Sequence, residues 1–221
     1  MRMLPAFLCV LTAGAVMAED AVTYEPGCTA KIYVIGRHNE HEKKENDKLW
    51  PIKALPDAPS ETIRLPGGPN IETDPSDKTN NGYPNYLVRS KLGLLKDVNY
   101  YAVEFEGWVQ AKADGVYTIS TQSDDPVEIF MEGKPVLRSD FFANWESRSL
   151  NELETAQGSV KLSVNKWYHV AVISRQRWCR SDGNGSWNTN RGAHLKVWMA
   201  TPGGQASIIP LCLPSKVAGQ Q

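Results

Sequence analysis

Residues 100–137 alternate apolar and polar side chains in short runs, and this alternation constrains the fold more than any other feature of the chain. The runs are separated by the turn-forming sequences Ala113-Asp114-Gly115 and Glu132-Gly133-Lys134. Period-two alternation is typical of strands whose two faces meet different environments, and glycine beside a polar residue favours a tight turn. We therefore expect four short antiparallel strands in this stretch.

Further strands are predicted on both sides of this stretch, over residues 28–35, 160–164, 167–174 and 193–200. Residues 50–85 are rich in Pro, Gly, Asn and Asp, which predicts turns and loops, and residues 139–158 are expected to form a looser connection. Many short strands without a convincing helical period indicate an all-β fold. We expect an antiparallel β-sandwich or barrel with long loops.

The first 18 residues have the pattern of a secretion signal. Arg2 supplies a positive charge, residues 4–16 form a short apolar stretch, and Val16-Met17-Ala18 fits a small-residue cleavage site. This stretch is too short for a membrane span, and no later segment is apolar enough to cross a bilayer. We expect residues 19–221 to form one secreted domain that acts outside the cell or at its surface.

The chain has four cysteines, of which Cys9 is expected to leave with the signal segment. The remaining Cys28, Cys179 and Cys212 cannot all pair within one chain. A disulfide between Cys28 and Cys212 would close a very long loop, worth about 4–5 kcal/mol in the chain-entropy model, and we predict this pair. Cys179 would then stay free or pair with another chain, and Cys179–Cys212 is the alternative pairing.

Charge and motif content narrow the class of function. The 24 basic and 25 acidic residues give a formal charge of −1, so we expect no long-range attraction to nucleic acid or to an anionic membrane. The chain lacks a nucleophile-elbow, zinc-protease or phosphate-cradling glycine motif. Glycoside hydrolysis needs carboxylates about 5–10 Å apart across a sugar, which neighbouring aspartates on one loop do not provide. The sequence favours a binding protein without catalytic residues.

Asp124 and Asp125 form the first candidate site, because adjacent carboxylates repel each other unless a cation lies between them. Calcium prefers about six to eight oxygen ligands, and carboxylates on a shaped loop suit it. Adjacent side chains of an ordinary strand point to opposite faces, so both could bind one ion only with an unusual backbone, such as a cis peptide. The alternative is a turn in which an aspartate caps loop amides.

Three segments, taken in chain order, resemble the protective-antigen-type domain, a β-sandwich found in toxins, glycosidases and yeast cell-wall adhesins. Residues 105–137 resemble its core strands and Ser-Asp-Asp loop, 160–174 resemble its next hairpin, and 194–204 resemble its closing strand and turn. The resemblance covers residues 100–209, and residues 28–35 fit a first strand. It implies the same all-β sandwich that the alternation predicts.

Within this family, the chain is most similar in site layout to the flocculin and epithelial-adhesin branch, whose members are calcium-dependent lectins. In that branch two consecutive aspartates hold the ion, a second loop supplies an asparagine and backbone carbonyls, and sugar hydroxyls complete the shell. The resemblance therefore implies Asp124, Asp125 and Asn184 as ligands of Ca²⁺. The second loop would be residues 175–192, where the spacing from Asn184 to Trp187 is one residue shorter than in the lectins.

The second loop holds further candidates. Asp182, Asn188 and Asn190 are alternative ligands. We assign Asp182 and Asn188 to the carbohydrate site together with Trp187, whose ring plane would stack on a sugar. Asn184 also opens an Asn-Gly-Ser glycosylation sequon, and a glycosylated Asn184 could not bind the ion. An ordinary glycine-rich surface loop is the third interpretation of this segment.

These expectations lead to two hypotheses for function. The first is a secreted, calcium-dependent lectin or adhesin that binds a cell-surface or extracellular glycan. The second is an extracellular protein-interaction or structural module that binds no glycan and assembles through Cys179. Trp108 and Trp198 fall inside predicted strands and are expected in the core, outside either site.

Overall fold

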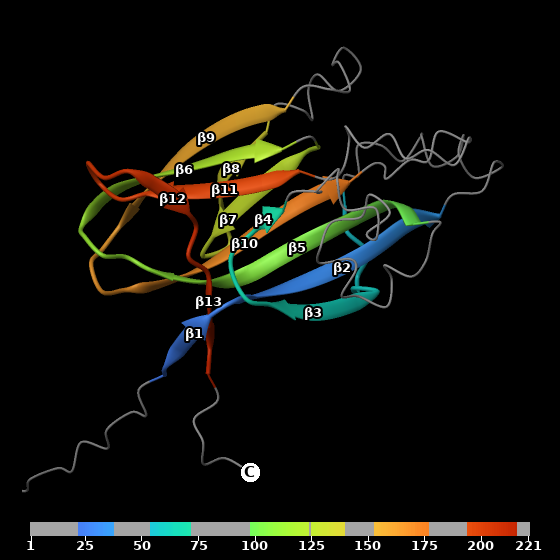
Figure 1. Ribbon diagram of the computed structural model, residues 1–221, viewed down its shortest axis with the longest axis horizontal. Coiled ribbons are helices and arrows are strands. Elements are labelled where there is room, and N and C mark those ends of the chain that lie inside the picture. The colour runs from blue at the N-terminus through green and yellow to red at the C-terminus, as the bar shows by residue number, and fades with distance from the viewer. Residues whose placement is uncertain are drawn as a thin grey trace, which may run out of the picture.

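The computed structural model describes residues 22–37, 54–71, 98–123, 125–139, 153–176 and 194–215. Within these ranges the chain forms strands and no helix, and the strands make two antiparallel sheets (Figure 1). No helix suited to crossing a membrane occurs in this described part. The predicted all-β, antiparallel sandwich is confirmed.

The larger sheet has eight strands in the described ranges, ordered β1-β13-β5-β10-β7-β8, with β2 beside β5 and β3 beside β2. Strand β5 is its centre, because it pairs with β10 on one side and with β2 and β13 on the other. Its strands are β1 (Tyr24–Pro26), β2 (Cys28–Arg37), β3 (Glu61–Leu65), β5 (Val98–Gln110), β7 (Val127–Met131), β8 (Lys134–Arg138), β10 (Trp167–Gln176) and β13 (Cys212–Pro214).

The smaller sheet has five strands in the described ranges, ordered β12-β11-β6-β9, with β4 also paired to β11. Its strands are β4 (Asn70–Ile71), β6 (Gly115–Ser123), β9 (Glu154–Leu162), β11 (Leu195–Ala200) and β12 (Ala206–Ile208). Chain neighbours β6 and β7 belong to different sheets, so the residues between them cross from one layer to the other.

The core lies between the two sheets and follows the period-two alternation. In β6, Tyr117 and Ile119 are buried while the residues between them are half-exposed. In β5, Val103 and Phe105 are fully buried in the same cluster. Burial of one face of each strand is the main stabilising term here, since each large apolar side chain contributes about 1.5–3 kcal/mol.

Two side chains close the hairpins at the end of the sandwich where β6 begins. The hydroxyl of Tyr117 accepts hydrogen bonds from the N–H groups of Lys112 and Ala113, each at 2.9 Å, and donates to the carbonyl of Ala113 at 3.1 Å. Asp114 Oδ1 accepts from the N–H of Val164 at 3.0 Å, which links this turn to the β9–β10 turn. This end is therefore held by side-chain contacts to the backbone.

The β7–β8 turn confirms the turn signal in the sequence. Met131 pairs with Lys134, so Glu132 and Gly133 alone make the turn, with φ of 50° and 71°. Positive φ at both central residues is typical of the tight turn that matches the twist of a hairpin. Gly133 adopts this conformation without steric cost.

Several strands differ from the sequence prediction. The looser connection expected over 139–158 is wrong for residues 154–158, because β9 begins at Glu154 and runs to Leu162. Strands β3 and β4 lie inside the region predicted as turns and loops, and β1, β12 and β13 were not predicted. Each of these last five strands has two to five residues, too few for alternation to stand out.

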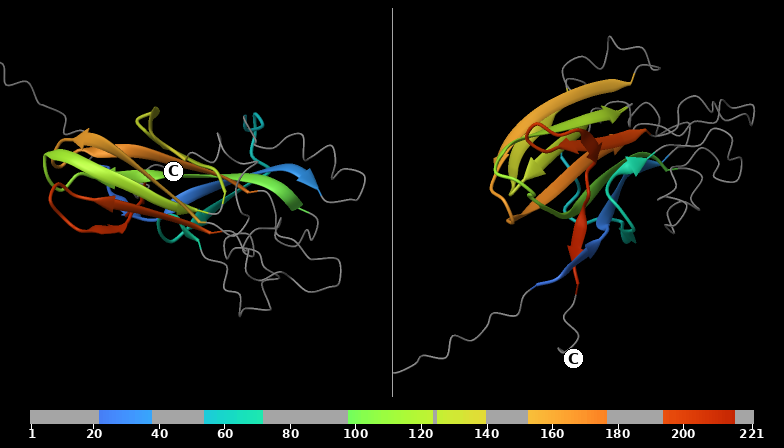
Figure 2. Two further views of the ribbon diagram at one scale, coloured as in Figure 1. Left: turned by 90° about the horizontal axis from the view of Figure 1, so that it is seen from above. Right: turned by 60° about the vertical axis from the view of Figure 1, so that its left-hand side comes forward.

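The β6–β7 crossing and the β1–β13 pair lie at different ends of the sandwich. Strands β2, β6 and β10 all end on the same side, on the right in Figure 1, where β6 leads into β7. Strand β1 pairs with β13 away from that side, and the two strands lie side by side in Figure 1 and in the right-hand view of Figure 2. The β6–β7 crossing therefore lies far from the β1–β13 pair.

Candidate functional site

The β6–β7 link is the crossing between the two sheets and contains the candidate aspartates. It starts after Ser123, the last residue of β6, and ends at Val127, the first residue of β7. Asp125 lies in a bend of this link and is half-buried. Asp124 lies outside the described residues. The structure thus places one of the two predicted carboxylates on a short connection between layers.

The β7 side of the link is fixed by direct hydrogen bonds to the backbone. The N–H of Arg175 in β10 donates to the carbonyl of Pro126 at 3.0 Å. Val127 and Ser139 form a pair of bonds: the N–H of Val127 donates to Ser139 Oγ at 3.1 Å, and the N–H of Ser139 donates to the carbonyl of Val127 at 2.9 Å. Asp125 is therefore attached directly to a rigid backbone position.

Buried polar side chains collect at this end of the molecule. Thr121 and Ser123 at the end of β6 are 1% and 0% exposed, and Glu154 at the start of β9 is 4% exposed. Ser123 is the direct partner of Glu154 across the β6–β9 pair, so their side chains share a face. The buried polar residues of the described part, all within reach of this end, are Thr121, Ser123, Ser139, Glu154, Ser174 and Arg175.

A half-buried ion pair lies on the outer face of the larger sheet beside the link. Arg175 Nη2 is 2.7 Å from Glu128 Oε2, and the two side chains are 5% and 17% exposed. Arg138 Nε approaches the other oxygen of Glu128 at 3.4 Å but is 61% exposed. Burial lowers the pKa of the Arg175 guanidinium, and the charge of Glu128 acts in the opposite direction.

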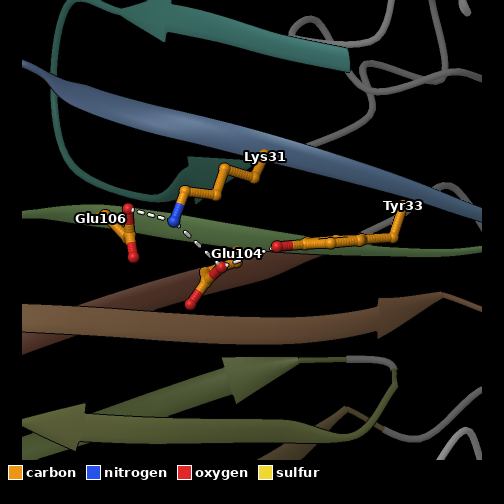
Figure 3. A network of polar contacts seen from close by, with 4 residues as sticks. All are labelled: Lys31, Tyr33, Glu104 and Glu106. Atoms are coloured by element: carbon orange, nitrogen blue, oxygen red, sulfur yellow. Dashed lines mark hydrogen bonds and ion pairs between the residues drawn. The ribbon is translucent and has the colours of Figure 1, made fainter. Parts of the chain in front are cut away.

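A second polar network lies on the same outer face, across β2 and β5 (Figure 3). Lys31 Nζ is 2.6 Å from Glu106 Oε2 and 3.5 Å from Glu104 Oε2, and the Tyr33 hydroxyl donates to Glu104 at 3.0 Å. One ammonium thus sits between two carboxylates and compensates their repulsion. This network joins two strands and is not arranged as a free acid–base pair.

The prediction that Trp108 and Trp198 lie in the core is wrong. Trp108 lies between Gly107 and Val109, both buried, and its own side chain is only half-buried on the opposite face. Trp198 lies likewise between the buried Val197 and the buried Met199 of β11. Both indoles therefore point away from the interior.

Trp108 belongs to an aromatic cluster at the end of the larger sheet where β1 and β13 pair. Tyr24 stacks on Trp167, with ring centroids 3.8 Å apart and planes 16° apart, and is tilted against Trp108 at 6.1 Å. His169 meets Trp108 edge-on at 5.3 Å. The cluster packs β1 against β5 and β10.

The predicted disulfide is absent from the structure, in which Cys28 and Cys212 are both free thiols. Cys28 alternates with Ala30 and Ile32 and faces the core. Cys212 is paired with Trp108 and therefore faces outward with it. Because the two sulfurs lie on opposite faces of one sheet, a bridge would require one strand to turn over. Burial raises the pKa of the Cys28 thiol to about 12.

The second-loop candidates lie outside the described residues: Asn184, Trp187, Asp182, Asn188 and Cys179. In the described part no group of three or more His, Cys, Asp or Glu side chains is arranged to hold a metal ion. The donors described at the link are the carboxylate of Asp125 and neighbouring backbone carbonyls. These hard oxygen donors fit calcium and would be poor ligands for softer metals.

Reasoning from the sequence did not single out Glu154, Thr121 and Ser123, which are buried polar side chains at this end of the molecule. The signal was present, because Thr121 and Ser123 continue the inward positions of Tyr117 and Ile119. A hydroxyl at an inward position of a strand is a buried polar group. Ser123 directly precedes the two aspartates, and Thr121 lies two residues before Ser123.

A family model for the PA14 domain matches residues 65–193 of the chain. This range contains β5 to β10 with the β6–β7 link, and it agrees with the protective-antigen-type resemblance carried by residues 105–137 and 160–174. No curated protein matches the chain.

Solved structures resemble the chain over most of its length. The A domain of epithelial adhesin 9 from Candida glabrata, solved with Galβ1-4GlcNAc, has a TM-score of 0.50 at 10% identity, covering 89% of this chain and 93% of that one. The PA14 sugar-binding domain from an RTX adhesin has a TM-score of 0.47 at 14% identity, covering 84% of this chain and 95% of that one. At these identities the similarity shows the fold alone.

Larger proteins also contain a similar unit. A β-glucosidase from Kluyveromyces marxianus has a TM-score of 0.42 at 12% identity, covering 79% of this chain but 16% of the enzyme. Two anti-sigma factor domain-containing proteins match with TM-scores of 0.48 and 0.46, and the chain spans 46% and 49% of their lengths. The chain is thus about half as long as these proteins, or less.

Proposed function

The chain belongs to the PA14 domain family, and we propose that it is a calcium-dependent carbohydrate-binding module that acts outside the cell or at its surface. The observation that carries the proposal is the position of Asp125 on the short crossing between the sheets. The carbonyl of Pro126 and both backbone groups of Val127 are fixed by hydrogen bonds. A carboxylate on a fixed backbone binds a cation without first ordering a loop, which favours affinity.

The proposed ligands are Asp124 and Asp125 from the link and Asn184 from the loop between β10 and β11. This assignment follows the resemblance to the lectin branch of the family. A bound calcium ion would offer open coordination positions to two neighbouring sugar hydroxyls. Trp187 would stack on the apolar face of the sugar ring, and Asp182 and Asn188 would hydrogen-bond its hydroxyls.

Two facts support binding over catalysis. The adhesin domain of the same fold was solved with a bound disaccharide, so a sugar site is compatible with this architecture. The carboxylates paired on the outer face, Glu104 and Glu106, are engaged by Lys31.

A calcium titration monitored by thermal unfolding tests the metal site. A ligand at about one hundred times its dissociation constant adds about 2.7 kcal/mol of stability, which corresponds to a rise of about 5–10 °C for a chain of this size. We expect this rise for wild type and its loss in Asp125→Asn. Glu25→Gln is the matched control, because Glu25 lies in β1 at the other end. An unchanged wild-type midpoint in calcium would refute the proposal.

A glycan array, read with and without a chelator, tests the carbohydrate site. We expect chelator-sensitive binding by wild type and none by Asp124→Asn/Asp125→Asn. Calcium-stabilised protein that binds no glycan would favour the alternative, an extracellular interaction module. Non-reducing gels of wild type and Cys179→Ser would then show whether it assembles through Cys179.

A further inference from the structure

The end of the sandwich interior below the β6–β7 link is polar on the side of the smaller sheet. Thr121 and Ser123 face inward from β6, two residues apart on one strand face. Glu154 faces the same interior from β9, directly opposite Ser123. We call Thr121, Ser123 and Glu154 the inner polar layer.

Both hydroxyls of this layer are enclosed by protein. Thr121 Oγ1 and Ser123 Oγ are almost inaccessible to solvent, and neither has a hydrogen-bond partner within the part of the chain that the structure describes. The residues paired with Thr121 on the two adjacent strands are both apolar, whereas Ser123 has one apolar partner and one acidic partner. Ala156 and Val197 pair with Thr121, and Leu195 pairs with Ser123 opposite Glu154.

Such hydroxyls are rare in native interiors, because each loses its bonds to bulk water on folding. Buried water is the usual partner for such groups, and one molecule typically makes about three hydrogen bonds. The Glu154 carboxylate adds acceptor capacity beside them, since it has about four lone-pair sites. A water molecule here could accept from a hydroxyl and donate to the carboxylate.

The inner polar layer lies at the β6 side of the link. The β7 side of the link is held by the direct bonds of Pro126 and Val127. The β6 side ends at Ser123, whose hydroxyl has no hydrogen-bond partner among the described residues. Water bound to Ser123 and Glu154 would fix this second side as well.

We propose that Thr121, Ser123 and Glu154 bind ordered water beneath the β6–β7 link, and that Glu154 acts through this layer as a positioning residue for the cation held by the link. The water site stands on the burial and pairing of the three side chains. The positioning role rests on the proposed function, because it requires that the link binds calcium.

An isosteric substitution tests the water site without any calcium. Thr121→Val replaces the hydroxyl by a methyl group of the same shape. If water satisfies the hydroxyl, the substitution breaks its hydrogen bonds, and we expect the unfolding midpoint to fall by about 2–4 °C. If the hydroxyl is truly unsatisfied, the substitution removes a desolvated polar group, and a higher midpoint would overturn the proposal.

Outward hydroxyls of the same strand provide the controls. Thr118 and Ser120 lie on the other face of β6 and are half-exposed, so Thr118→Val and Ser120→Ala are expected to change the midpoint by less than Thr121→Val and Ser123→Ala. Magnetisation transfer from long-lived water to the amides of Thr121 and Ser123 is the direct measurement. Its absence at both amides in the folded chain would overturn the water site.

Calcium affinity at a fixed temperature tests the positioning role. Glu154→Gln keeps the shape and removes the charge, and we expect the dissociation constant for calcium to rise about tenfold, as for other outer-shell carboxylates. Glu25→Gln should leave it unchanged. A Glu154→Gln variant that is less stable without calcium but binds calcium as wild type does would show a merely structural role. If wild type binds no calcium, the proposed function and the positioning role both fail, and the water site is decided by Thr121→Val and the magnetisation-transfer measurement.

Discussion

Gly158 of β9 lies directly against the backbone carbonyl of Val136 in β8, and this contact closes one side of the sandwich. A Cβ at residue 158 would be 2.2 Å from Val136 O and 3.2 Å from the Cβ of Leu137. Strand β8 ends the larger sheet and β9 ends the smaller one. Only glycine lets the two end strands approach this closely.

Gly158→Ala should therefore destabilise the fold. The added methyl group meets backbone, which cannot rotate away, so we expect the free energy of unfolding to fall by about 1–3 kcal/mol, as for other overpacked sites. Gly67→Ala is the control, because no atom lies within 4 Å of a Cβ at that position. Denaturant unfolding of the two variants checks this, and equal midpoints would show that β8 and β9 separate without cost.

The same glycine explains why β9 was difficult to predict. Its sequence from Glu154 to Leu162 lacks large apolar side chains at several inward positions, because β8 already fills the space at Gly158. Alternation was a reliable signal where side chains meet across the core, as in β6, β7 and β11. It failed at Gly158 of β9, where the strand backbone packs against the backbone of β8, because such a contact requires no large apolar side chain in the sequence.

Where a strand was recognised from the sequence, alternation also predicts on which face of the sheet each of its side chains lies. Trp108 shares the parity of Glu104 and Glu106, and all three lie on the outer face. For Cys212 the sequence held no equivalent information, because β13 is only three residues long and its pairing with β5 sets its face. The aspartate link could be located from the sequence, whereas the buried partner Glu154 required knowledge of the β6–β9 register.

The two free thiols should differ in reactivity. Cys28 is fully buried, and a pKa of about 12 in place of 9.0 reduces its thiolate population near pH 8 about a thousandfold. Cys212 is half-exposed, so alkylation of the folded protein without reductant should modify Cys212 and spare Cys28. Peptide mapping by mass spectrometry measures both sites, with the denatured chain as the control. Protection of both thiols in the denatured, unreduced chain would instead indicate that they are bridged.

Glu128 allows a buried and an exposed cation to be compared on one carboxylate. Arg175 is 5% exposed at 2.7 Å, and Arg138 is 61% exposed at 3.4 Å. Exposed ion pairs contribute about 0–1 kcal/mol, whereas breaking a buried pair costs about 3–5 kcal/mol. We expect Arg175→Met to lower the free energy of unfolding several times more than Arg138→Met. A double-mutant cycle with Glu128→Gln separates the pair energies, and similar coupling for both arginines would contradict this expectation.

The Lys31 network predicts a loss of stability at alkaline pH. Burial lowers the pKa of Lys31, but the hydrogen bond to Glu106 and the charges of Glu104 and Glu106 together raise it above the ordinary 10.5. Burial, and then the hydrogen bond to Glu104, raise the pKa of Tyr33 above 10.0. Both groups bind their protons more tightly in the folded chain than in the unfolded chain. Their contribution is therefore complete below about pH 10 and is lost as the pH rises through the folded pKa values.

Denaturant unfolding across pH 7 to 11 measures this loss. We expect wild type to lose stability above about pH 10, and Lys31→Met/Tyr33→Phe to lose less over the same interval because neither replaced side chain titrates. Lys134→Met is the matched control, since Lys134 is exposed at the β7–β8 turn and should leave the alkaline slope unchanged. The double variant should also be less stable at pH 7, where the network is intact in wild type. An alkaline slope equal to that of wild type would show that other groups titrate. Cys28 would then be the first candidate, because its raised pKa also predicts a loss of stability as the pH rises.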